Sequence, residues 1–195
     1  RIIAALSAIN IFLIGAGVNG GGGPPPPPTQ QFVGTKQLLV KNPSVPASRR
    51  AVYQVKERKG SGHTLVGDPR TGGATLHVQL DGVSECFTMP SVRWQGSGST
   101  FKYVDSLGVA GPVSAAEIKV QSGGALSIKV VVMGRNGAVT LVPPNPGVLA
   151  DTDFSIGGGG EYCGSTAGGA IKPNTAKTFK GKNAPPPAAC YVGPC

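Results

Sequence analysis

The stretch VSAAEIKVQSGGALSIKVVVMGRNGAVTLV, from Val113 to Val142, alternates apolar and polar residues and interrupts the alternation with turn residues. Alternation with a period of two residues is typical of strands that bury one face. The apolar positions that we expect to face inward are Ala116, Ile118, Val120, Leu126, Ile128, Val130 and Val132. The SGG segment and the Asn136-Gly137 pair suit tight hairpin turns, which need positive φ angles. We therefore predict a three-stranded antiparallel meander over 113–120, 125–133 and 138–142.

Similar short runs precede this meander, and glycine-rich sequence follows it. The further strands that we predict are 37–41, 51–57, 74–80, 84–89 and 100–105, with an Asp81-Gly82 turn before 84–89. No stretch between Thr29 and Cys195 has a convincing helical period. Regularly spaced strands with turn signals indicate a sandwich or a barrel. We predict an all-β fold with an antiparallel β-sandwich-like head.

The composition agrees with a loop-rich β domain. The chain has 195 residues, enough for one domain with a real core. It contains 31 glycines and 18 prolines, yet 39% of its residues are hydrophobic, which suits many short strands joined by tight turns.

The N-terminal part divides into an apolar run and a linker. Residues 1–18, RIIAALSAINIFLIGAGV, resemble the end of a secretory signal peptide. The alternative, which we expect, is an apolar arm for assembly or anchoring. Its isoleucines favour a strand and its alanines a helix; we expect an extended strand. Residues 19–31, NGGGGPPPPPTQQ, form a linker that is flexible in its glycine half and stiff in its proline half. The head domain is then 32–195.

The arm carries the side chains that we expect to mediate assembly. They are Ile2, Ile3, Leu6, Ile9, Ile11, Phe12, Leu13, Ile14 and Val18.

The net charge of +9 favours anionic surroundings such as polysaccharide, membrane surfaces or nucleic acid. Only 6% of the residues are aromatic, which supplies few platforms for stacking bases, so nucleic acid is not the expected partner. One basic patch comprises Arg49, Arg50, Lys56, Arg58 and Lys59, and a second comprises Lys172, Lys177, Lys180 and Lys182. Both patches are also compatible with ordinary solvated surface.

The four cysteines, Cys86, Cys163, Cys190 and Cys195, allow three full pairings. None belongs to a CxxC motif and no histidine adjoins them, which argues against zinc. Four buried free thiols are the alternative; we expect two disulfides and an oxidising compartment.

Five segments resemble a loose group of secreted bacterial β-rich proteins of no assigned function. They are LLVKNPS, LVGDPRTGGATLHV, FKYVDSLGVAGPVSAAEIK, GALSIKV and FSIGGGGEYC…TFKGKNAPPPAAC. The resemblance implies secretion, a β fold and a Cys163–Cys190 disulfide, which leaves Cys86–Cys195 as the second pair. It implies no particular chemistry.

The arm adds a looser resemblance, to pilins and to donor-strand filament subunits, in which an apolar N-terminal segment completes a neighbouring subunit. We therefore expect a structural subunit of an extracellular filament or pilus-like assembly, with copies of itself as partners. The alternative is a membrane-tethered or secreted module that binds anionic glycans.

Candidate residues for chemistry are few. We predict that His63 lies in a loop and that His77 points outward from a strand. Neither has a recognisable nucleophile beside it. Asp151, Asp153 and Glu161 lie in DTDFSIGGGGE, which fails the EF-hand pattern but leaves a different calcium site open. We expect no enzyme activity and no cofactor.

Overall fold

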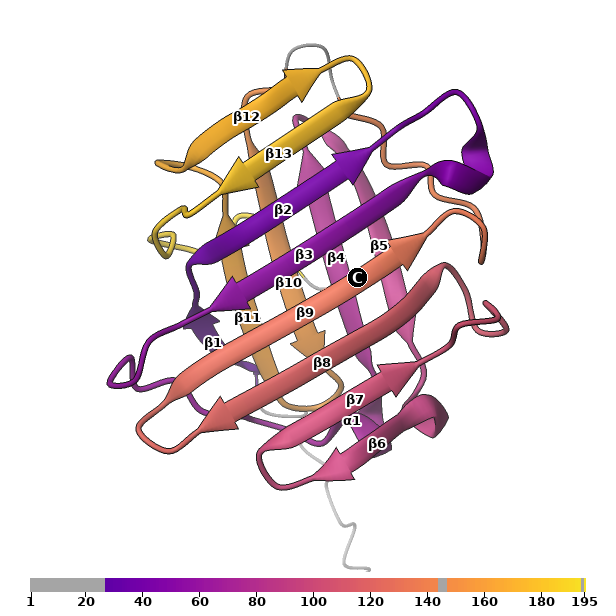
Figure 1. Cartoon of the computed structure of the whole chain (residues 1–195). Helices are drawn as coiled ribbons and strands as arrows, with labels where there is room; N and C mark the ends of the chain where they lie inside the picture. Colours follow the sequence, from indigo (N-terminus) through magenta and orange to yellow (C-terminus); the bar gives the residue numbers. More distant parts are fainter. Residues whose placement is uncertain (1–26, 144–146, 194) are drawn as a thin grey trace, which may run out of the picture.

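The computed structural model describes residues 27–143, 147–193 and 195, and shows two β-sheets stacked as a sandwich (Figure 1). The predicted arm, residues 1–18, and the linker up to residue 26 lie outside the described residues. The described chain enters the fold at Thr29, as β1 (Thr29–Phe32). In the described part, no helix is both long and apolar enough to cross a bilayer.

The five-stranded sheet has the order β1-β11-β10-β4-β5. Its remaining strands are β11 (Gly160–Ser165), β10 (Ala150–Ile156), β4 (Ala74–Leu80) and β5 (Val83–Met89). β1 pairs with β11 in parallel, and the other neighbours are antiparallel.

The eight-stranded sheet lies in front of it in Figure 1, with its strands crossing those behind at an angle. Its order is β12-β13-β2-β3-β9-β8-β7-β6. The strands are β12 (Ala170–Thr175), β13 (Thr178–Lys182), β2 (Thr35–Lys41), β3 (Arg50–Lys56), β9 (Ala125–Met133), β8 (Val113–Gln121), β7 (Thr100–Val104) and β6 (Trp94–Ser97). Every pair in this sheet is antiparallel.

Among the residues that the structure describes, helical structure is confined to short connections. They are η1 (Pro46–Ser48), α1 (Pro69–Gly72) and η2 (Ser91–Arg93). Asp68 caps α1 by accepting a hydrogen bond from the backbone N–H of Arg70 at 2.8 Å.

The core lies between the two sheets and uses the alternate residues that the sequence pattern predicts. Ile118, Leu126, Ile128, Val130 and Val132 are all fully or almost fully buried. The prediction of an all-β sandwich is therefore confirmed, as are the 113–120 and 125–133 strands and their turn. The Asp81-Gly82 turn is also confirmed, since both residues have positive φ angles and join β4 to β5.

The predicted third strand of the meander, 138–142, is wrong. The free edge of β9 that this strand would need is taken by β3, which pairs with β9 from Arg50↔Met133 to Lys56↔Ser127. The 138–142 segment instead forms no strand, with Val139 and Leu141 buried. Neither Asn136 nor Gly137 has a positive φ angle, so the predicted hairpin turn does not form.

A side chain on the five-stranded sheet holds this segment in position, and no backbone pairing with a neighbouring strand is involved. Glu85 Oε2 accepts hydrogen bonds from the backbone N–H groups of Thr140 at 2.9 Å and Leu141 at 2.5 Å. Val139 and Leu141 therefore alternate because both side chains are buried, although the segment pairs with no strand.

A close backbone approach joins α1 to the turn between β10 and β11. A Cβ atom on Gly157 would lie 2.1 Å from the carbonyl oxygen of Gly72. We predict that Gly157→Ala lowers the free energy of unfolding by about 1–3 kcal/mol, because backbone must move to admit the methyl group. Denaturant unfolding measures this, with Gly193→Ala as the matched control, since a Cβ there meets nothing within 4 Å. Equal stabilities for the two variants would contradict the prediction.

Candidate functional site

The outer face of the eight-stranded sheet is the surface turned away from the core. β3 shows which residues reach it: Ala51, Tyr53 and Val55 are buried in the core, so Arg50, Val52, Gln54 and Lys56 point outward. The strand register then identifies the outward residues of the neighbouring strands.

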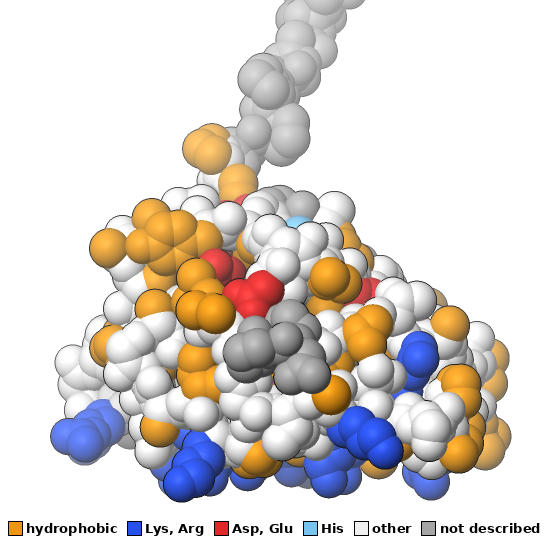
Figure 2. All heavy atoms as spheres, turned by 90° about the horizontal axis from the view of Figure 1, so that it is seen from above, with side chains coloured by type: hydrophobic (Ala, Val, Ile, Leu, Met, Phe, Trp, Pro, Cys, Tyr) orange, Lys and Arg blue, Asp and Glu red, His pale blue; other side chains and the backbone are white. Residues whose placement is uncertain are grey.

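Basic side chains concentrate on this outer face. The outward strand positions hold eight of the chain's 18 Lys and Arg residues: Lys41, Arg50, Lys56, Lys102, Lys119, Lys129, Lys180 and Lys182. Among the same positions, the single carboxylate is that of Glu117. Figure 2 looks along the sandwich from above, and Lys and Arg gather along its lower edge, the side of this sheet. The outer face therefore carries a strong positive field.

The polar side chains align across the strands. Six residues on six adjacent strands are register partners in succession: Lys102, Glu117, Lys129, Gln54, Gln37 and Lys182. We call this set the polar row. Neighbouring strands lie about 4.8 Å apart, so the row is about 24 Å long. It presents cations at both ends and near the middle, with amide donors and acceptors between them.

An apolar row runs beside the polar row, at a distance of two residues on each strand. Its members are Val104, Ala115, Val131, Val52 and Leu39, and Lys180 ends it. Val104 is 58% exposed, whereas Val52 is buried among its neighbours. The two rows together form a flat strip with one ionic side and one apolar side.

Most cations of this face are not neutralised inside the described chain. Glu117 Oε1 lies 3.0 Å from Lys119 Nζ and 3.9 Å from Lys102 Nζ. The other six basic side chains of the face make no ion pair with any described residue. Partial burial, followed by the charges of Lys182 and Lys41, lowers the pKa of Lys180. An anionic ligand would relieve this repulsion.

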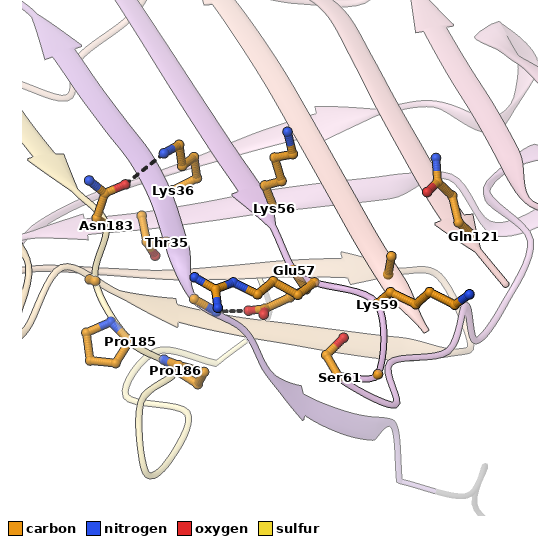
Figure 3. A pocket seen from close by; sticks show the side chains of 15 residues that line it. Thr35, Lys36, Lys56, Glu57, Lys59, Ser61, Gln121, Asn183, Pro185 and Pro186 are labelled. Atoms are coloured by element: carbon orange, nitrogen blue, oxygen red, sulfur yellow. Dashed lines mark hydrogen bonds between the residues drawn. The ribbon is translucent and has the colours of Figure 1, made fainter. Parts of the chain in front are cut away.

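A hollow of about 1260 Å³ lies beyond the end of β3, next to the polar row. Figure 3 shows Lys36, Lys56 and Lys59 around it, and Arg58 also lines it. Lys36 Nζ donates a hydrogen bond to Asn183 Oδ1 at 2.9 Å. The backbone N–H of Gly34 donates to Glu57 Oε1, and His63 Nε2 lies 4.0 Å from that oxygen. The cations around the hollow therefore surround the Glu57 carboxylate, whose Oε1 already accepts the Gly34 hydrogen bond.

The structure divides the first predicted basic patch. Lys56, Arg58 and Lys59 line the hollow, but Arg50 stands at the opposite end of β3, about 20 Å away along a seven-residue strand. Arg49 is not free for a ligand, because its Nη1 donates to the carbonyl oxygen of Val139 at 2.7 Å. The prediction that these five residues form one patch is therefore wrong.

The second predicted patch lies on one hairpin, β12–β13, in which the register gives Lys172 no partner. Lys180 and Lys182 point outward on β13, Lys177 lies in the β12–β13 turn, and Lys172 lies on β12. Lys102 and Lys129 belong to neither predicted patch. Alternation marks Lys129 as an outward residue of its strand, but only the strand order shows which outward residues are neighbours.

The opposite face of the sandwich, the outer face of the five-stranded sheet, is partly covered by the C-terminal strap, of which residues 184–193 and 195 are described. The structure joins Cys163 to Cys190 and Cys86 to Cys195, the pairs that the resemblance implied. These bonds fix the strap to β11 and β5, so it crosses β10 and β4 between them. The Nδ1 atom of His77 lies within hydrogen-bond distance, 2.7 Å, of the Gly193 carbonyl oxygen under the strap.

The candidate calcium residues lie on this second face, on β10 and β11. Their three carboxylates do not form a group with all ligand atoms within 4.8 Å of one another; in the described chain, the groups that do are His77 with Cys86 and Cys195, and Glu161 with Cys163 and Cys190. Both groups contain a disulfide, which leaves no thiolate for a metal.

Comparisons with protein-family models, with curated proteins and with solved structures each find no match to this chain. The resemblance to secreted β-rich proteins therefore stays a prediction, and functional inference depends on the surface chemistry alone.

The Lys180 environment generates a salt-dependent prediction. We expect Lys180→Gln to raise the melting temperature at low ionic strength, because it removes a partly desolvated charge beside Lys182 and Lys41. The gain should shrink in 1 M NaCl, where the Debye length is about 3 Å. Thermal scans at both salt concentrations measure it, and a gain that is independent of salt would contradict the electrostatic explanation.

Proposed function

We propose that this protein binds an anionic polysaccharide across the outer face of its eight-stranded sheet. The single observation that carries the proposal is the polar row from Lys102 to Lys182, which crosses six strands in one line. A row of this kind matches an extended polymer with repeated carboxylate or sulfate groups better than a small compact ligand.

The chemistry on both sides of the row supports a sugar polymer. Lys129 and Lys182 supply charge-assisted donors, and Gln54 and Gln37 supply neutral donors and acceptors for hydroxyl groups. The apolar row offers a surface for the C–H faces of sugar rings. This face carries no aromatic residue at its outward positions on the six strands of the rows, so it lacks the stacking platforms that single-stranded nucleic acid uses.

The setting that we propose is extracellular or at a cell surface. Two disulfides are consistent with an oxidising environment. The first expectation from the sequence, a filament joined through residues 1–18, depends on residues outside the described part and stays a prediction. The expectation that the protein is not an enzyme stays a prediction as well.

The test is binding to immobilised polygalacturonate, with neutral dextran as the comparison polymer. We expect retention on the acidic polymer at low ionic strength and release as salt rises, because exposed charge pairs are screened. Lys129→Gln with Lys182→Gln should weaken binding about tenfold, equivalent to about 1.4 kcal/mol.

The matched control is Arg135→Gln with Lys177→Gln, which removes the same net charge from turns outside the polar row. We expect it to bind within about twofold of the unmodified protein, since exposed charges away from the ligand contribute little. Equal losses in the two double variants would show that only net charge matters. That result, or no retention at low salt, would refute the proposal.

A further inference from the structure

Asp153 and Glu161 face the underside of the C-terminal strap. Asp153 is the register partner of Cys163, and alternate residues of a strand share a face, so Glu161 lies on the same side as Cys163. The Cys163 side chain reaches the strap through its bond to Cys190. The two carboxylates are therefore diagonal neighbours on β10 and β11, on the outer face and beneath the strap.

Both side chains are removed from solvent. Asp153 is 1% exposed and Glu161 is 4% exposed. A surface carboxylate on a sheet is normally solvated, and burying one without compensation costs several kcal/mol. The strap thus buries these two carboxylates, which the sheet alone would leave exposed to solvent.

The compensation is incomplete within the described chain. Neither carboxylate oxygen of Asp153 has a hydrogen-bond partner there, and Asp151 Oδ1 on the same strand is also buried without one. Glu161 Oε2 accepts a hydrogen bond from Gln30 Nε2 at 3.0 Å. Neither Asp153 nor Glu161 makes an ion pair with a described residue.

No basic side chain is available from the surrounding elements. The five strands of this sheet and the strap contain no Lys or Arg. His77 on β4 is the one imidazole in these strands, and its Nδ1 is already engaged with Gly193. Burial and the charge of Glu161 raise the pKa of Asp153 from 3.8 to about 7. His77 is the register partner of Asp153, but no described basic group makes an ion pair with either carboxylate.

An opening on one side of the strap leads to Glu161, one member of the pair. A hollow of about 620 Å³ lies between the strap and the start of β1. The residues that line it are Pro27, Pro28, Gln30, Glu161, Cys190, Val192 and Gly193. A hydrated metal ion can enter by this route and reach the Glu161 carboxylate.

We propose that Asp153 and Glu161 bind a divalent calcium ion beneath the C-terminal strap. The donors near the pair are carboxylate and amide oxygens, which suit a hard cation, while all four cysteine sulfurs are in disulfides. Calcium accepts irregular sets of carboxylates, carbonyl groups and water, whereas magnesium demands a near-ideal octahedron. The ion joins β10 to β11 beneath the strap and supplies the missing charge.

The experiment is thermal unfolding of the full chain at pH 7.5, in excess calcium and in chelator. We expect calcium to raise the melting temperature by about 5 °C or more, since a ligand that binds the folded state stabilises it. Asp153→Asn should melt higher than the unmodified protein in chelator, because it removes an unpaired buried charge, and should lose the calcium shift. Glu161→Gln should lose the shift as well.

Asp68→Asn is the matched control, because it removes one carboxylate from the N-terminus of α1, outside the strap and the polar row; it should keep the full calcium shift. Calorimetric titration of the unmodified protein with calcium measures binding directly and does not depend on any variant folding. The proposal is overturned if titration detects no binding, or if Asp153→Asn keeps the shift.

A proton shared by the pair is the competing explanation. A carboxyl whose pKa is raised on folding stabilises the folded state below its unfolded pKa, and this stability is lost as pH rises through the folded pKa. If stability falls between about pH 4 and pH 7 by the same amount in calcium and in chelator, the pair shares a proton. That result would overturn the calcium site.

Discussion

The pairing of β3 with β9 is the contact on which the rest of the structure depends. These strands lie far apart in the sequence, yet they pair over seven residues, from Arg50↔Met133 to Lys56↔Ser127. The pairing joins β12, β13, β2 and β3 to β9, β8, β7 and β6, and so makes one eight-stranded sheet from two smaller ones. It also aligns Gln54 with Lys129, without which the polar row would be two separate fragments.

The two outer faces of the sandwich differ sharply in charge. One sheet presents eight cations and one carboxylate, and the strands of the other contain carboxylates but no Lys or Arg. A shared core of apolar residues separates these faces, so each keeps its own chemistry. The basic face is open and flat, which suits a polymer. The acidic face is partly covered by a strap that two disulfides hold to the sheet, which suits a small enclosed ion.

The sequence predicted much of the local structure and little of the long-range arrangement. Alternation located 113–120 and 125–133, since a strand that buries one face must alternate. The same pattern misled at 138–142, where Val139 and Leu141 are buried without a strand partner. The strand Thr29–Phe32 escaped prediction because it is short, mostly polar and paired in parallel with β11. The polar row was out of reach because strand order decides which outward residues become neighbours.

The most direct test of the account is a residue-by-residue map of the bound polymer. Amide chemical shifts of the isotope-labelled protein, titrated with oligogalacturonate at low salt, report which strands the ligand contacts. We predict that the largest changes form one band across β7, β8, β9, β3, β2 and β13, at the residues of the polar and apolar rows. Changes centred on the strap, or scattered over every exposed lysine, would contradict it.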